Sequence, residues 1–367
     1  MLVVVKITFV LPNVQISGGI KATLAMADAL QDLGHQIKVV YPIIPARDGL
    51  PWTNLRKSGV QLVRACQNLV IPSWIERPQN LTRIPWAASR FLPDADILVL
   101  TWWHDVPIFA DSPTGSGLAV HYVRSLETWG GPEKLVLESY RRVMPRVVTS
   151  TVLEAQVKSA GGRVDARIPD GLEPGFLGLP LPQRVARQIP RIGILYRLQD
   201  WKRMDDAFEA ISQVRAKQEI HLTVFGQRMR GRHKAIFDSL PHKSYLHMPT
   251  GDKIRDVYRT LDIFLYSSNE TEAFGLPPFE ALACGVALVC TRVGAIPEFL
   301  EHNVDALLTT PEAPEELAQG MLALLDDRGR RDKLAAHGQQ TVQRLNWLQS
   351  ARYFEDYLRT QVVHVDG

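Results

Sequence analysis

Short apolar runs alternate with helix-like patterns along most of this chain. Such runs, with few polar interruptions, are typical of strands that are covered on both faces of a parallel sheet. The first of them is Val3–Val10, and the segment after it carries apolar residues at helical spacing until Gly34. These apolar positions are Ile20, Leu24, Ala27 and Leu30. The pattern predicts a strand, a loop and a helix that ends at Gly34.

The same order of elements recurs in both halves of the chain, which is typical of a doubly wound α/β fold. A helix is predicted at Met204–Val214 in the second half. Further strands are predicted at Ile37–Val40, Ile97–Leu100, Ala119–Tyr122, Val147–Thr149, Ile192–Tyr196, Leu222–Phe225, Tyr245–Met248 and Ile263–Tyr266. We therefore expect two α/β domains, each built on a parallel sheet.

A segment rich in turn residues separates the two halves. Residues 168–175 and 179–182 contain several prolines and glycines, which favour loops over regular structure. We expect an N-terminal domain at residues 1–172, a linker at 173–190 and a C-terminal domain at 191–345. The remaining residues, 346–367, are predicted to form one more helix, from about Trp347 to Thr360.

Composition and charge narrow the class of protein. A chain of 367 residues with 46% hydrophobic and 22% charged residues is suited to two folded domains. Its three cysteines are too few for a disulfide framework, which favours a cytoplasmic location. Lys6 interrupts the first apolar run, so we interpret that run as a strand and not as a signal peptide. No apolar run reaches the roughly 18 residues of a membrane-spanning helix.

The charge balance gives no sign of nucleic-acid binding. The formal net charge is only +3, whereas nucleic-acid binding needs a concentrated basic face. Basic clusters such as Arg141 and Arg142 are typical of solvated helix faces. They leave open a peripheral contact with anionic lipid at the inner face of a membrane.

The most informative segment lies between a predicted strand and a predicted helix, at residues 267–285. Glu272 and Glu280 flank a glycine-containing loop, and the tandem prolines Pro277 and Pro278 suit the first turn of a helix. The amides of residues 274–276 then lie at a helix N-terminus, where they can bind an anion. Each carboxylate can accept hydrogen bonds from a vicinal diol. Together these groups suit a ligand that contains a sugar, a diphosphate and a ribose.

This segment resembles the Glu-x7-Glu signature of retaining glycosyltransferases with the GT-B fold, family 4 (glycosyl transferases group 1) in particular. The resemblance implies an α/β fold of two Rossmann-like domains that face a central cleft, with a C-terminal helix that crosses back to the N-terminal, acceptor-binding domain. It implies that Glu280 binds the ribose hydroxyls and Glu272 the transferred sugar. The amides of Phe274, Gly275 and Leu276 would contact the sugar and the β-phosphate.

Two cations follow the strand Ile192–Tyr196, at the end of the strand where α/β sheets bind ligands. Arg197 and Lys202 are separated by a short loop, so both can be directed at one point. A departing nucleotide diphosphate gains negative charge, which fixed cations stabilise. In the family that the segment resembles, an arginine and a lysine at similar spacing bind the diphosphate.

The resemblance also implies roles for residues of the N-terminal half. Gly18 and Gly19, at a strand-to-helix turn, are similar to a glycine loop that approaches the β-phosphate. His121 matches a histidine that contacts a hydroxyl of the transferred sugar. The neighbouring residues 121–129 also resemble, faintly, bacterial rhamnosyltransferases of surface glycan synthesis. The aromatic residues that could form a stacking wall for the acceptor sugar include Trp102, Trp103 and Trp129.

No metal ion and no cofactor is expected. Asp94 and Asp96 imitate the Asp-x-Asp metal motif of another glycosyltransferase fold, but they precede a predicted strand instead of following one. Their carboxylates would therefore lie at the wrong end of the sheet. Histidines and cysteines show no zinc-like spacing.

The sequence thus predicts a retaining, metal-independent glycosyltransferase. It would move a hexosyl unit from a nucleotide-diphosphate sugar to a carbohydrate or glycolipid hydroxyl in surface glycan biosynthesis. One alternative is a protein that binds sugar nucleotides without turnover. Another is an NAD-dependent oxidoreductase, which would need a Gly-x-Gly-x-x-Gly motif after the first strand. The chain has Ser17, Gly18 and Gly19 at that place, which argues against the oxidoreductase.

Overall fold

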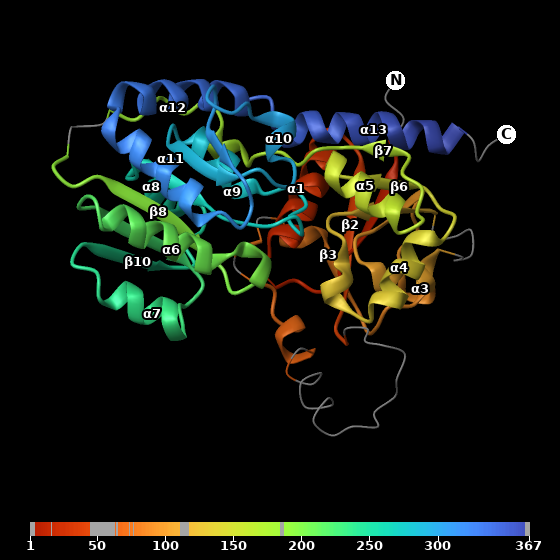
Figure 1. The fold of residues 1–367 in the computed structure, drawn as a ribbon. Coiled ribbons are helices and arrows are strands. Elements are labelled where there is room, and N and C mark those ends of the chain that lie inside the picture. The colour runs from red at the N-terminus through yellow and green to blue at the C-terminus, as the bar shows by residue number, and fades with distance from the viewer. Residues whose placement is uncertain are drawn as a thin grey trace. The chain divides into compact units, whose positions relative to one another are not determined.

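The computed structural model describes residues 4–15, 17–44, 63, 65–72, 74–75, 77–110, 117–183 and 187–363. The chain divides into two compact units (Figure 1). The first unit consists of Met1–Gly171 together with Trp347–Gly367, and the second consists of Leu172–Asn346. Residues 173–190, which the sequence predicts as a linker, belong to the second unit by this division.

The first unit is built on a seven-stranded parallel sheet with the strand order β3-β2-β1-β4-β5-β6-β7. Its strands are β1 (Lys6–Val10), β2 (Gln36–Pro42), β3 (Leu81–Ile84), β4 (Ile97–Leu100), β5 (Leu118–Val123), β6 (Arg146–Val148) and β7 (Ala166–Arg167). Its helices of four or more residues are α1 (Gly18–Asp32), α3 (Val106–Phe109), α4 (Glu133–Arg141), α5 (Thr151–Ser159) and α13 (Trp347–Val363).

Local chemistry explains where the first long helix begins and ends. Ser17 is the N-cap of α1, and its Oγ accepts a hydrogen bond from the amide of Ile20 at 3.2 Å. The helix is followed by Gly34, whose φ of +99° suits glycine. The last helix, α13, packs against α1, so the C-terminal segment belongs to the first unit (Figure 1).

The second unit contains a six-stranded parallel sheet with the order β10-β9-β8-β11-β12-β13. Its strands are β8 (Arg191–Tyr196), β9 (His221–Gly226), β10 (Lys243–His247), β11 (Ile263–Tyr266), β12 (Ala287–Thr291) and β13 (Leu307–Thr309). Its α-helices are α6 (Met204–Arg215), α7 (Gly231–Asp238), α8 (Asp252–Arg259), α9 (Leu276–Ala283), α10 (Ile296–Phe299), α11 (Pro314–Asp326) and α12 (Arg328–Val342).

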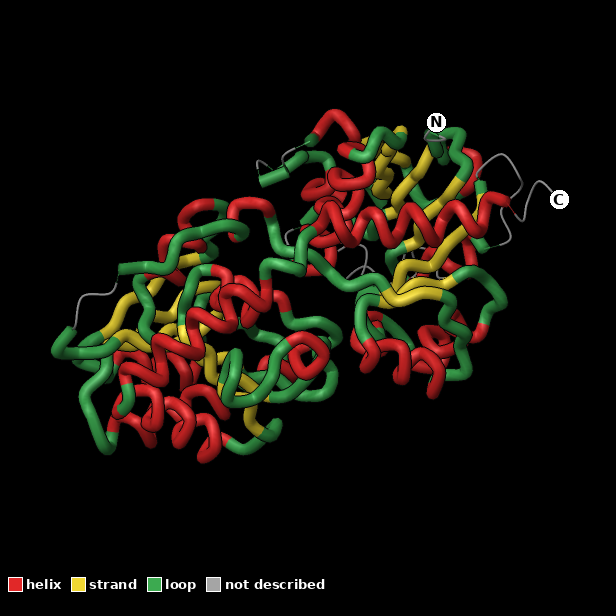
Figure 2. Tube along the Cα trace, turned by 90° about the horizontal axis from the view of Figure 1, so that it is seen from above, coloured by secondary structure: helices red, strands yellow, loops and turns green. Residues whose placement is uncertain are grey.

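The central strands of the second sheet are buried on both faces, which explains their continuous apolar sequences. Ile263 and Leu265 of β11 belong to a core cluster with residues of α6 and α11. Phe264 and Tyr266, which point to the opposite face, belong to a second cluster with residues of α8 and α9. The α/β fold predicted from the apolar runs is confirmed. Figure 2 shows strands and helices of both units in a view from above.

The structure also contains strands that the sequence did not indicate. β3 has the sequence Leu-Thr-Arg-Ile and β7 has only two residues, so neither forms an apolar run. Both pair with a neighbouring strand that was predicted, which means that the sheet and not their own sequence makes them strands.

In both sheets the strand order reverses its direction once. The reversal lies between β1 and β4 in the first unit and between β8 and β11 in the second. At such a switch point the loops after the two strands diverge and leave space for a ligand at the carboxyl edge of the sheet. Among the described residues, no helix is long and apolar enough to cross a membrane.

We predict that Gly226→Ala destabilises the second unit. Gly226 ends β9 with a φ of +121°, and a Cβ there would lie 2.5 Å from the backbone oxygen of Tyr196. Backbone strain of this kind costs about 1–3 kcal/mol, which urea denaturation of the purified variant would measure. Gly19→Ala is the control, because a Cβ at Gly19 meets nothing within 4 Å and no positive φ is involved. Equal stability of the two variants would contradict the prediction.

Candidate functional site

The predicted site residues of the second unit follow the two strands that flank its switch point. Arg197 comes directly after β8, and Lys202 ends the short 3-10 helix η7 (Asp200–Lys202) that follows. Glu272 lies in the loop after β11, six residues beyond the end of that strand. Because β8 and β11 are neighbours in the sheet, these loops start side by side at its carboxyl edge.

Lys202 and Glu272 form an ion pair at this edge. The Lys202 Nζ contacts Glu272 Oε2, and both side chains are largely buried, with 17% and 11% of their surface exposed. The hydroxyl of Tyr266 lies 3.0 Å from the Lys202 Nζ and donates a hydrogen bond of 2.5 Å to Glu272 Oε2. Two groups predicted to contact the donor are therefore in direct contact with each other.

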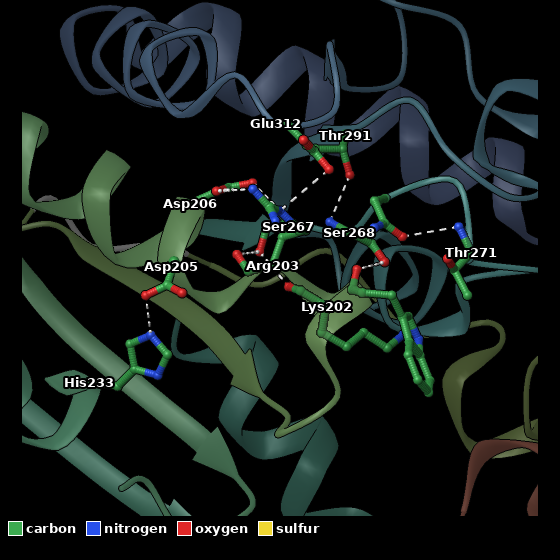
Figure 3. Close-up of polar contacts among 12 residues, drawn as sticks. Lys202, Arg203, Asp205, Asp206, His233, Ser267, Ser268, Thr271, Thr291 and Glu312 are labelled. Atoms are coloured by element: carbon green, nitrogen blue, oxygen red, sulfur yellow. Dashed lines mark hydrogen bonds and ion pairs between the residues drawn. The ribbon is translucent and has the colours of Figure 1, made fainter. Parts of the chain in front are cut away.

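Two serines after β11 fix the segment that carries Lys202. The Ser267 hydroxyl lies 2.9 Å from the backbone oxygens of Lys202 and Arg203. The Ser268 hydroxyl lies 2.8 Å from the backbone oxygen of Trp201 and 3.2 Å from Glu272 Oε2. The Ser268 amide in turn donates to the hydroxyl of Thr291 in β12 at 3.0 Å (Figure 3). The backbone around Lys202 is thus attached to the loop that carries Glu272.

The charge state of Glu272 depends on these neighbours. Burial alone would raise its pKa, but the Lys202 charge and the hydrogen bonds from Lys202, Tyr266 and Ser268 outweigh burial and hold the pKa below its usual value. Glu272 is therefore an anion at neutral pH. Burial, and secondarily the Glu272 charge, raises the pKa of Tyr266 well above its usual value, so the tyrosine keeps its proton.

The loop between the two glutamates begins α9 as the sequence predicts. Gly275 is the N-cap of α9 with a φ of +85°, and prolines occupy the first turn. Phe274 is buried, and its backbone oxygen accepts a hydrogen bond of 3.1 Å from the amide of Ala295. A Cβ at Gly294 would lie 3.0 Å from that same oxygen, so Gly294 allows the close packing of the loop. The turn at residues 274–276 is therefore held in a defined conformation.

Glu280 and Arg197 share one environment. The hydroxyl of Tyr258 in α8 donates a hydrogen bond of 3.0 Å to Glu280 Oε2. Burial lowers the pKa of Arg197, whereas the nearby groups Tyr258, Glu280 and Tyr266 act to raise it. The Arg197 Nη1 also lies 3.4 Å from the sulfur of Met248. Arg197 thus lies close to Glu280 and to the two tyrosines that contact the glutamates.

The structure brings the predicted residues of the second unit together in one region. These are Arg197, Lys202, Glu272, Phe274, Gly275, Leu276 and Glu280. Sequence reasoning missed Tyr258, Tyr266 and Ser268, which contact the two glutamates. The one signal available for Tyr266 was its place as the last residue of a predicted strand at the carboxyl edge.

Gly18 and Gly19 lie in the first unit, at the first two positions of α1. Neither has a positive φ, and a Cβ at either position would meet nothing within 4 Å. The fold of the unit therefore gives no reason for glycine at these positions, and the space beside them is open.

The structure argues against the predicted sugar contact of His121. This residue lies inside β5 and is only 1% exposed, and its ring stacks on Tyr140. Its Nδ1 accepts a hydrogen bond of 3.4 Å from the Arg146 Nε. Burial and then the Arg146 charge hold the pKa of His121 well below its usual value, so the imidazole is neutral. We correct its assignment to a residue of the core.

The three predicted tryptophans lie together, but they are not equally accessible. The ring centroids of Trp102 lie 5.4 Å from those of Trp129 and 6.4 Å from those of Trp103. Trp103 is only 3% exposed, so it fills the core and cannot stack on a sugar. Trp129 is 54% exposed and Trp102 is half-buried, which keeps both available to a ligand. The predicted aromatic wall is thereby reduced to two residues.

In the Asp-x-Asp segment, the carboxylate of Asp96 serves the fold. Asp96 directly precedes β4, and its Oδ2 accepts a hydrogen bond of 2.7 Å from the amide of Lys6 at the start of β1. It therefore lies at the amino edge of the sheet, away from the switch point. Within the described residues, no three His, Cys, Asp or Glu side chains are grouped as metal ligands.

Comparison with known families gives this geometry a context. Residues 186–341 match the family described as Glycosyl transferases group 1. A D-inositol 3-phosphate glycosyltransferase of Xylanimonas cellulosilytica is 30% identical over 184 residues, which cover 48% of this chain and 42% of the relative. An uncharacterized glycosyltransferase of Methanocaldococcus jannaschii is 28% identical over 117 residues, or 32% of this chain and 28% of the relative. These matches span less than half the length of either relative.

Solved structures extend the similarity of the fold to the whole chain. Anabaena HepE in complex with UDP-glucose has a TM-score of 0.72 at 15% identity, covering 97% of this chain and 100% of that one. Sucrose-phosphate synthase from Thermosynechococcus elongatus also has a TM-score of 0.72 at 15% identity, with 98% and 99% covered. The predicted GT-B fold and the resemblance to glycosyl transferases group 1 are confirmed. The retaining mechanism and the rhamnosyl link stay predictions.

We predict that Glu272→Gln lowers stability at pH 7 and not in acid. Loss of a charged hydrogen-bond partner costs about 1.5–3 kcal/mol. Because the folded-state pKa of Glu272 is depressed, its contribution is present above the unfolded pKa and is lost as pH falls through the folded pKa. Urea denaturation at pH 7 and near pH 3 would measure the difference.

The control for this variant is Glu270→Gln, an exposed glutamate of the same loop. We expect that change to stay within about 0.5 kcal/mol of the wild type. The interpretation of Glu272 would be wrong if its variant lost the same free energy of unfolding at both pH values.

Proposed function

We propose that this chain is a glycosyltransferase that moves a hexosyl unit from a nucleotide-diphosphate sugar to a carbohydrate or glycolipid hydroxyl. The observation that carries the proposal is the contact of Lys202 with Glu272 beside the helix N-terminus of the Phe274–Leu276 turn. Cation, carboxylate and directed amides are the three kinds of group that a sugar diphosphate needs. The match of residues 186–341 to glycosyl transferases group 1 supports the same conclusion.

In this proposal the cations bind the diphosphate and the glutamates bind hydroxyls. Arg197 and Lys202 meet the phosphates, together with the amides of the 274–276 turn. In the first unit, the open space beside Gly18 and Gly19 supports a role in close approach to a phosphate. Glu272 binds the transferred sugar. Glu280 binds the ribose, with Tyr258 fixing one oxygen of its carboxylate.

The charges of these residues suggest how the reaction is accelerated. As the glycosidic bond breaks, negative charge grows on the leaving diphosphate, where Arg197 and Lys202 stabilise it without rearrangement. We propose that this positive charge replaces a divalent metal ion. We also propose that the acceptor attacks on the face of the leaving group, so that the anomeric configuration is retained. The departing phosphate then takes the proton of the acceptor hydroxyl.

Features of the first unit support a glycolipid acceptor. A groove of about 800 Å³ is lined mainly by apolar residues: Val14, Gln15, Val63, Cys66, Gln67, Val70, Pro72 and Trp74. Its volume lies in the range of ligand-binding pockets. Val63 and Val70 are more than half exposed. In our proposal this groove takes an apolar chain, while Trp102 and Trp129 stack on the acceptor sugar.

A glycolipid acceptor also implies where the protein acts. We propose peripheral contact with the cytoplasmic face of the inner membrane and a role in surface glycan biosynthesis.

Two other functions compete with glycosyl transfer as explanations of the residues around the switch point. A binding protein without turnover would hold the donor and never release nucleotide diphosphate. A nicotinamide-dependent enzyme would need a glycine-rich motif after β1 that this sequence lacks.

The direct test is turnover of sugar nucleotides by the purified chain. UDP-glucose is the first donor to try, since a structural relative has been solved with it, followed by other uridine, guanosine, adenosine and thymidine diphosphate sugars. We expect a cognate donor to raise the Tm and to release nucleotide diphosphate when a glycolipid acceptor is added. Stabilisation without release would favour a binding protein. Turnover that is lost in EDTA and restored by magnesium or manganese would contradict the metal-independent mechanism.

We predict that Glu280→Ala weakens donor binding by about 1.5–3 kcal/mol, the usual effect of losing a charged hydrogen-bond partner. Calorimetric titration with the cognate donor would measure the Kd. Glu301→Ala is the matched control, because Glu301 is an exposed glutamate of the same unit. Unchanged affinity of the Glu280 variant would rule out the ribose contact.

A further inference from the structure

Tyr266 lies between the two charged groups of the proposed donor site. It ends β11, is only 4% exposed, and its hydroxyl is 3.0 Å from the Lys202 Nζ and 2.5 Å from Glu272 Oε2. The Lys202 ammonium also lies 5.3 Å from the centre of the tyrosine ring, within range of a cation–π interaction. One side chain thus contacts both members of the ion pair.

The hydrogen bonds of this hydroxyl have one consistent arrangement. An ammonium can only donate and a carboxylate can only accept, so the hydroxyl accepts from Lys202 and donates its single proton to Glu272. The high pKa of Tyr266 keeps that proton in place at neutral pH. Ser268 lies 3.2 Å from the same carboxylate oxygen, but its one proton can also go to the Trp201 backbone oxygen at 2.8 Å. Of the two hydroxyls, Tyr266 is therefore the one that has Glu272 as the single acceptor among these contacts.

Donor binding must separate the two charges that are in contact in this structure. A diphosphate would attract the Lys202 ammonium, and Glu272 would have to turn its free lone pairs toward sugar hydroxyls. Without a further partner for each group, re-formation of the Lys202–Glu272 ion pair would compete with binding of the donor. The tyrosine hydroxyl has a lone pair for the ammonium and a proton for the carboxylate, so its two hydrogen bonds do not require the charged groups to touch.

We propose that Tyr266 is a positioning residue of the glycosyl-transfer reaction, whose hydroxyl hydrogen-bonds the Lys202 ammonium and the Glu272 carboxylate and so limits how far each moves when the donor separates them. This inference rests on the proposed function. Because the diphosphate charge is largest in the transition state, accurate placement of Lys202 matters more for turnover than for binding. Loss of the hydroxyl then lowers kcat more than it raises the KM for the donor.

The second unit offers a matched comparison. Tyr196 ends β8, the neighbouring strand, and is only 2% exposed. Its hydroxyl contacts His233 Nδ1 at 3.0 Å and neither Lys202 nor Glu272. Tyr196→Phe and Tyr266→Phe each remove one hydroxyl from a buried ring at the end of a central strand. A purely structural effect would therefore be similar in the two variants.

The experiment measures kcat and the KM for the cognate donor in the wild type, Tyr266→Phe and Tyr196→Phe, with circular dichroism and calorimetry to check folding and donor affinity. We expect Tyr266→Phe to lower kcat about tenfold with less than about a threefold change in KM, and Tyr196→Phe to stay within about twofold of the wild type in both. Equal effects of the two variants, or a loss in donor affinity alone, would overturn the positioning role.

A pH profile gives a second readout that a structural role would not change. The groups that act on Glu272 and Tyr266 are Lys202 from η7, Ser268 after β11, Cys290 from β12 and Arg197 after β8. Tyr266 is one of the groups that lower the pKa of Glu272, so its removal should shift the acid limb of kcat to higher pH. An unshifted limb in Tyr266→Phe would count against the proposal.

The outcomes separate the two hypotheses. A wild type that binds donors but releases no nucleotide diphosphate with any acceptor would overturn the proposed function and this inference with it. A wild type that turns over, combined with a Tyr266→Phe variant that behaves like Tyr196→Phe, would overturn this inference alone.

Discussion

The reversal of strand order between β8 and β11 is the constraint on which the candidate site depends. After β8 the chain adds β9 and β10 toward one edge of the parallel sheet, and after β11 it adds β12 and β13 toward the other edge. The loops after β8 and β11 therefore diverge. The first loop carries Arg197 and Lys202, and the second carries Glu272 and the turn that begins α9. In a sheet without such a reversal, the loops that connect successive strands would cover the carboxyl edge at this place. The position of the site therefore follows from the order of the strands in the sheet.

Electrostatics then decide how this site can be used. A lysine and a glutamate with most of their surface buried would each be costly alone, and their contact offsets part of that cost. The hydroxyls of Tyr266 and Ser268 satisfy the same carboxylate oxygen and lower the proton affinity of Glu272. As a result this part of the site is a contact between groups of opposite charge. A ligand that carries both anionic phosphates and neutral hydroxyls can replace this contact on each side.

The first unit shows how burial distinguishes residues that look alike in sequence. His121 and Trp103 both belong to the core, with 1% and 3% of their surface exposed. Trp129 is 54% exposed although it lies close to Trp102. The glycine after it allows the chain to pass near the Trp102 ring, since a Cβ at Gly130 would lie 2.4 Å from that ring. An imidazole that faces Arg146 inside the protein cannot also face a substrate.

The sequence by itself determined the alternation of buried strands and amphipathic helices, and with it the two parallel sheets. It also determined the turn into α9, because glycine tolerates a positive φ and prolines are suited to the first turn of a helix. In the structure Gly275 has a φ of +85° and the prolines follow it. These features are local, and a few neighbouring residues are enough to produce them. The tertiary structure alone decided which polar groups meet: Tyr266 and Lys202 are 64 residues apart, and Tyr258 and Glu280 are 22 apart. It likewise decided that His121 is buried, because burial depends on what packs over a strand and not on the strand itself.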